Sequence, residues 1–167
     1  MNKLFSDISG FERWESVEPL NKGWSTDKKY IVKTKEGEKL LLRIADGSEL
    51  EQKKKEYEII GKYAKLGFDM SKPMDFGVCD DGAHTYMLLT WVEGEDLESA
   101  LPKLSKEEQY ELGRCAGTIL RRIHDIPVIP TITCQCYLLH TALLFHRFVS
   151  VPPSLRNVKA ATVSFPS

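Results

Sequence analysis

Apolar and polar residues alternate along several short segments of the first ninety residues, and this alternation predicts β-strands. Two such segments are 12–20 and 29–35, which are separated by a polar loop with one glycine, NKGWSTDK. A third is 39–45, which follows the hairpin sequence KEGEK. Two more lie within 72–94, on either side of a turn at 80–82. The second of these, HTYMLLTWV, is apolar enough for a central strand.

The third segment, KLLLRIAD, contains one permanently charged residue among apolar ones. Strand alternation puts Arg43 on the face that also carries Leu41 and Ala45. A guanidinium stays protonated in a protein, and burying it without a partner is very costly. Arg43 therefore either reaches solvent or meets an anion that the fold supplies.

Residues 48–67 have the period of an amphipathic helix. Ser48 and Glu51 have the spacing of a capping box, and Gly67 is the expected C-terminal stop. Glu56 falls in the middle of the apolar half, so it needs a cation as Arg43 needs an anion. We expect the two to form a charge-assisted pair, with Glu58 as the fallback partner if the helical register differs. Such a pair either has a functional use or only fixes the orientation of the helix.

A second helical region follows a short segment, EGEDLESAL, that is suited to starting a helix. Ser105 and Glu108 again have capping-box spacing. Leu112, Ile119 and Ile123 belong to an apolar stripe at helical spacing.

Composition and charge exclude several classes of protein. The chain has 24 acidic and 23 basic residues and a net charge of −1, so nucleic acid is not an expected partner. No apolar run approaches the roughly 18 residues of a membrane span, and the first residues do not form a signal peptide. We therefore expect a cytoplasmic protein with no membrane partner, whose four cysteines are reduced thiols. Cys134 and Cys136, with the histidines after them, do not have the spacing of common zinc sites, so no metal site is predicted.

The order of these features resembles the N-terminal lobe of a kinase, and the details resemble the aminoglycoside phosphotransferase family. The loop NKGWSTDKKYIV lacks the G-x-G-x-x-G of protein kinases and is similar to that family's shorter loop of Gly, a large residue and Ser. KLLLRIAD is similar to its third strand, LLTWVEGEDL to the linker between lobes, and LGRCAGTILRRIHDI to the next helix. The resemblance covers residues from about 10 to 127.

The resemblance implies an α+β fold: a kinase-like N-terminal lobe with a five-stranded antiparallel sheet and one packed helix, followed by a linker and helix. The implied domains are a nucleotide-binding lobe at 1–92, a linker and first helix of a second lobe at 93–127, and an atypical tail at 128–167.

The resemblance also implies a binding site for ATP or GTP. Phosphates would meet Ser25 and the backbone amides from Gly23 through Trp24 to Thr26. Arg43 would contact the phosphates and Glu56 would hold Arg43, while Leu41 would pack on the adenine. Around Trp91, the Thr90 carbonyl and the Val92 amide would bind the base edge. The implied reaction is phosphorylation of a hydroxyl on an aminoglycoside-like or related small molecule, with Mg²⁺ as the family's metal.

The catalytic elements that the family carries in its second lobe are missing after residue 125. Those elements are a His-Gly-Asp-x-x-x-x-Asn loop and a later Asp-containing segment, whereas residues 126–167 contain no Asp, Glu or Gly. We therefore expect this chain to be inactive alone, with no catalytic residues. Either the tail is a frameshifted reading of a phosphotransferase gene, or the chain is a genuine non-catalytic module that binds a nucleotide or another protein. Translating the DNA beyond codon 128 in all three frames separates these explanations.

Overall fold

The computed structural model describes residues 3–21, 25–95 and 97–126. The chain divides into two compact units. The first contains Met1–Val92 together with Arg122–Ile126, and the second contains Glu93–Arg121.

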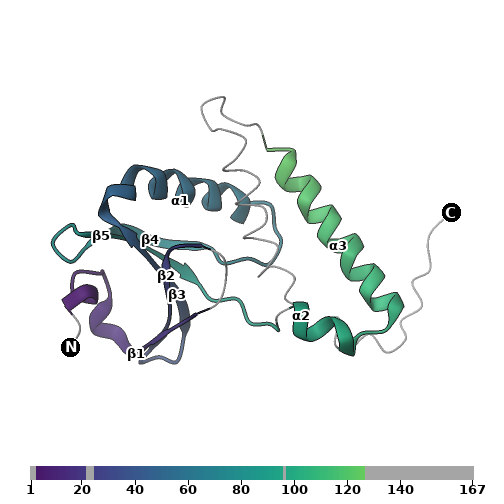
Figure 1. Ribbon diagram of the computed structural model, residues 1–167, viewed down its shortest axis with the longest axis horizontal. Coiled ribbons are helices and arrows are strands. Elements are labelled where there is room, and N and C mark those ends of the chain that lie inside the picture. The colour runs from purple at the N-terminus through teal and green to yellow at the C-terminus, as the bar shows by residue number, and fades with distance from the viewer. Residues whose placement is uncertain (1–2, 22–24, 96, 127–167) are drawn as a thin grey trace. The chain divides into compact units, whose positions relative to one another are not determined.

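The first unit is built on a five-stranded sheet (Figure 1). Its strands are β1 (Trp14–Pro19), β2 (Lys28–Thr34), β3 (Lys39–Asp46), β4 (Pro73–Cys79) and β5 (His84–Thr90). They lie in the order β1-β2-β3-β5-β4, and every neighbouring pair is antiparallel. The α+β class, the five-stranded antiparallel sheet and the central place of β5 are confirmed.

Both faces of the sheet are covered, which explains why β3 and β5 are apolar along most of their length. On one face, Leu42 and Ile44 pack in a cluster with Phe5 and Ile8 from the N-terminal segment. The opposite face, which carries Arg43, is covered by helix α1 (Leu50–Ala64) (Figure 1).

The start of α1 differs from the predicted capping box. A 3₁₀ turn at Gly47–Glu49 precedes the helix, and Asp46 accepts the Ser48 backbone N–H at 2.9 Å and the Ser48 hydroxyl at 2.6 Å. Ser48 is thus a donor to the preceding aspartate and does not cap Glu51. An Asx-type turn explains the difference, because an aspartate two residues ahead competes for the same backbone N–H.

The second unit contains α2 (Leu97–Ala100), a 3₁₀ turn at Leu101–Lys103 and most of α3 (Lys106–His124). Here the predicted capping box is confirmed. The Ser105 N–H donates to the Glu108 carboxylate at 2.8 Å, and the Glu108 N–H donates to the Ser105 hydroxyl at 3.2 Å. Ala100 and Leu112 form its small buried cluster. Across the described ranges, no helix combines the length and apolar character needed to cross a membrane.

Candidate functional site

The third strand and the first helix bring together the two charged residues that the sequence singles out. Arg43 Nη1 lies 2.6 Å from Glu56 Oε1, and the Glu56 side chain is 6% exposed. The expected pair is therefore present, and Glu58 lies on the exposed side of α1. The pairing follows from the fold, because β3 presents Arg43 to the sheet face on which α1 packs.

A second carboxylate holds the same guanidinium. Arg43 donates to Asp27 Oδ2 from Nε at 2.8 Å and from Nη2 at 2.5 Å. The Asp27 side chain is 2% exposed. It lies one residue before β2, directly after Ser25 and Thr26, and its backbone N–H donates to Ser25 Oγ at 3.1 Å.

Lys53, from the first half of α1, contacts both of these carboxylates. Its Nζ lies 2.6 Å from Asp27 Oδ1 and 3.4 Å from Glu56 Oε2. A longer contact of 3.7 Å reaches Glu49. Asp27, Arg43, Glu56 and Lys53 thus form a closed ring of alternating charge, which we call the ion-pair ring. In each carboxylate one oxygen faces Arg43 and the other faces Lys53, and the four formal charges sum to zero.

The ring shifts the pKa values of Asp27 and Arg43. Burial opposes ionisation of Asp27, but Arg43 and Lys53 outweigh it and hold the pKa of the Asp27 carboxyl below its usual range. Burial also disfavours the charged form of Arg43, and Glu56 and Asp27 reverse that effect, so the Arg43 pKa is raised. The Asp27 carboxyl therefore stays ionised and the Arg43 guanidinium stays protonated at neutral pH, as their ion pair requires.

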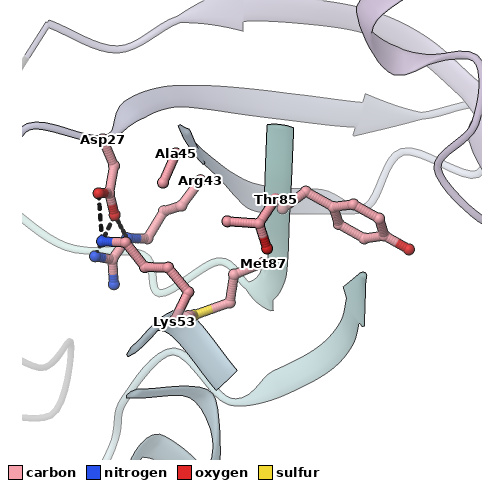
Figure 2. Close-up of a pocket in the computed structure, with 7 residues that line it drawn as sticks. Asp27, Arg43, Ala45, Lys53, Thr85 and Met87 are labelled. Atoms are coloured by element: carbon pink, nitrogen blue, oxygen red, sulfur yellow. Dashed lines mark hydrogen bonds and ion pairs between the residues drawn. The ribbon is translucent and has the colours of Figure 1, made fainter. Parts of the chain in front are cut away.

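A small pocket opens beside the ring (Figure 2). Arg43 and Ala45 of β3, Thr85 and Met87 of β5, and Lys53 of α1 line it together with Asp27 and Tyr86. Figure 2 shows the Asp27 carboxylate facing the nitrogens of both cations. The space amounts to about 160 Å³, including volume open to solvent.

The residues predicted to contact the base lie on β3, at the end of β5 and directly after β5. Leu41 is buried on the same strand as Arg43. Thr90 ends β5, and its hydroxyl accepts the Lys72 N–H at 2.8 Å. The residues after it, Trp91 and Val92, are half-buried.

The predicted phosphate loop is only partly described. Ser25 is half-buried and Thr26 is exposed. Gly23 and Trp24 lie outside the described residues, as do Cys134 and Cys136.

Sequence reasoning missed two members of the ring. Lys53 had a detectable signal, because at 100° per residue it falls within the apolar half of the helix, three residues before Glu56. Asp27 gave no such signal in the sequence, because it follows a polar segment in which an aspartate is expected to be exposed. Its role depends on the pairing of β2 with β3, which places residue 28 opposite Ile44 and Lys29 opposite Arg43.

The acidic side chains of the site are engaged by cations. No group of three or more histidine, cysteine or acidic side chains converges in this part of the chain. Asp27 and Glu56 are the buried acids of the site, and both are neutralised by cations.

The five-stranded antiparallel sheet and the packed helix with its Arg43–Glu56 pair define a kinase-like N-terminal lobe. The sequence model of the phosphotransferase enzyme family (APH) matches residues 16–149, which is more than half of the chain. The chain therefore belongs to this phosphotransferase family. The matched range ends within the 128–167 segment. A comparison with curated proteins gave no significant match.

Proposed function

We propose that the first unit binds the phosphates of ATP or GTP and that the chain descends from enzymes that phosphorylate a hydroxyl of a small molecule. The observation that carries the proposal is a guanidinium held at the sheet face by Glu56, in a chain of the phosphotransferase family. In phosphoryl transfer by kinases, a basic residue on the third strand contacts the phosphates and a helix glutamate positions it.

The proposed site extends to both sides of Arg43. The loop with Ser25 and Thr26 would supply backbone amides to the phosphates. Leu41 would pack against the base, and the chain at Thr90 and Val92 would hydrogen-bond its edge. An aminoglycoside-like acceptor is one candidate substrate, and other small molecules with hydroxyls fit the same chemistry.

Calorimetric titration of the purified chain with ATP, and separately with GTP, tests this proposal. We expect saturable binding by the wild type and at least about tenfold weaker binding by Arg43→Met, since a hydrogen bond to a charged group contributes about 1.5–3 kcal/mol. The matched control is Lys39→Met, at the first residue of the same strand, where the side chain is exposed. Its affinity should equal that of the wild type.

Two results would contradict the proposal. Wild-type protein that shows no saturable binding would rule out the nucleotide site. Equal affinity in the wild type and Arg43→Met would leave the ion-pair ring a purely structural device that orients α1. Circular dichroism of each variant must show the native spectrum, because Arg43→Met leaves Asp27 and Glu56 with Lys53 as their shared cation.

The second candidate is a non-catalytic module that binds a nucleotide or another protein. The observation that favours it is the absence of Asp and Glu from residues 126–167. Binding of ATP without transfer to any acceptor supports this candidate, whereas phosphorylated product excludes it.

A further inference from the structure

The position of Lys53 in the ion-pair ring is not explained by contact with Arg43. Its ammonium is bonded to the oxygen of Asp27 that Arg43 does not use. It also meets the oxygen of Glu56 that Arg43 does not use. Lys53 therefore fixes the orientation of both carboxylates that hold the guanidinium.

We infer that Lys53 is a positioning residue that sets the orientation of Arg43 through Asp27 and Glu56, and so sets the affinity of the lobe for nucleotide phosphates. This inference rests on the proposed function. Lys53 need not touch the nucleotide.

The charges of the ion-pair ring predict that loss of Lys53 weakens phosphate binding. With Lys53 present, two cations face two carboxylates and the ring is neutral. Without its charge, two buried carboxylates share Arg43 alone and the ring carries one net negative charge. That excess draws the guanidinium toward the protein and repels an incoming phosphate, because charges a few ångströms apart interact strongly away from water.

The burial of Lys53 indicates that it does more than keep the surface of α1 hydrated. Lys53 is 7% exposed as a whole residue, whereas Lys54 and Lys55 on the same helix are exposed. A lysine loses hydration and side-chain freedom on burial, so its contacts with Asp27 and Glu56 must offset both costs. The neighbouring Lys54 therefore offers a matched control that removes a lysine charge from α1 without touching the ring.

The first experiment reports on Arg43 without any nucleotide. In a ¹H–¹⁵N spectrum of arginine side chains, the Arg43 Nε–H signal is assigned by its absence from Arg43→Met. We expect Lys53→Met to shift this signal and raise its hydrogen-exchange rate about tenfold, while Lys54→Met leaves both unchanged. Lys53→Arg should restore a slowly exchanging signal, because it keeps the charge and two or more donors. An unchanged shift and exchange rate in Lys53→Met overturns the inference.

The second experiment measures ATP affinity by calorimetry. We expect Lys53→Met to bind ATP about tenfold more weakly than the wild type, and Lys54→Met to match the wild type. The double variant Arg43→Met, Lys53→Met should bind no more weakly than Arg43→Met alone, because Lys53 acts through Arg43. Additive losses would mean that Lys53 contacts the phosphates itself, which overturns the positioning role.

The two proposals fail in different ways. If the wild type binds no ATP, the proposed function fails and the Arg43 signal alone decides the positioning role. If the wild type binds ATP and Lys53→Met binds equally well, the inference fails and the function stands. Should Lys53→Met not fold, the charge-balanced variant Asp27→Asn, Lys53→Met replaces it. The exchange rate of the Arg43 Nε–H in that variant is compared with the rate in Asp27→Asn alone, because Asp27 is the acceptor of this N–H. Equal rates overturn the inference.

Discussion

At the scale of single residues, the stability of the site depends on each of the four charged side chains of the ion-pair ring. Burying an ion pair has a desolvation cost that attraction repays only when the remaining lone pairs and protons are also satisfied. The ion-pair ring meets that condition for its carboxylates, because each uses one oxygen for Arg43 and the other for Lys53. Loss of one partner from a buried pair costs about 3–5 kcal/mol, so every substitution in the ring needs a stability measurement beside the functional one.

The lowered pKa of Asp27 predicts an acid-dependent loss of stability. The unfolded aspartate has a pKa of about 3.9, so below that pH the unfolded state binds more protons than the folded state. The stabilisation is complete above about pH 4 and is lost as the pH falls through the folded pKa. In urea unfolding at pH values between about 2.5 and 5, Asp27→Asn should therefore show a smaller rise of unfolding free energy with pH than the wild type.

Asp69→Asn is the control for this measurement, because Asp69 is exposed and lies outside the ring. It should keep the wild-type pH slope. A wild-type slope in Asp27→Asn would mean that the ring does not hold the Asp27 carboxylate in its ionised form.

The site was only half predictable from the sequence. Arg43 and Glu56 stand out because each is a charge at a position where the local period requires an apolar side chain. Lys53 could be detected in the same way. Asp27 could not, since only the strand register and the packing of α1 bring residues 27, 43, 53 and 56 together.

Among the elements, α1 and the turn that follows it each contain a glycine, and the two glycines differ in what an added Cβ would do. Gly61 lies inside the helix, and a Cβ there would meet only the Pro73 side chain, at 3.8 Å, an ordinary contact. Gly67 follows the helix at φ +77°, a conformation that other residues adopt at a cost. Gly61→Ala should therefore stabilise the protein by about 0.5–1 kcal/mol, because alanine has the higher helix propensity. Gly67→Ala should destabilise it by about 1 kcal/mol.

Chemical denaturation of the two variants beside the wild type measures both effects. Opposite signs are the expected result. Destabilisation by Gly61→Ala would show that the approach of β4 to α1 is closer than an added methyl group tolerates.

The elements were more predictable than the site, because each is encoded by a local pattern. Period-two segments located all five strands, although β1 begins two residues later than expected, after a 3₁₀ turn at Phe11–Arg13. The helix beginning near residue 50 was also predicted, but its capping was not, because Asp46 and Ser48 both offer side-chain oxygens to the same turn.

For the whole molecule, the distribution of acidic residues bears most on activity. Asp125 is the last of the 24 acidic residues, so residues 126–167 offer no carboxylate for orienting an acceptor hydroxyl or binding magnesium. In the described part of the site, Asp27 and Glu56 are tied to cations. The proposed nucleotide binding can therefore be tested apart from phosphoryl transfer.

We predict that the chain binds ATP but transfers no phosphate to an acceptor. The test incubates the protein with γ-labelled ATP, Mg²⁺ and a set of hydroxyl-bearing acceptors, including aminoglycosides, choline and sugars. Equilibrium dialysis should show ATP bound by the wild type and weakened by Arg43→Met, while labelled acceptor stays at the level of a protein-free control. Labelled product that disappears in Arg43→Met would contradict the prediction, because it would require an acceptor-orienting carboxylate elsewhere in residues 1–125.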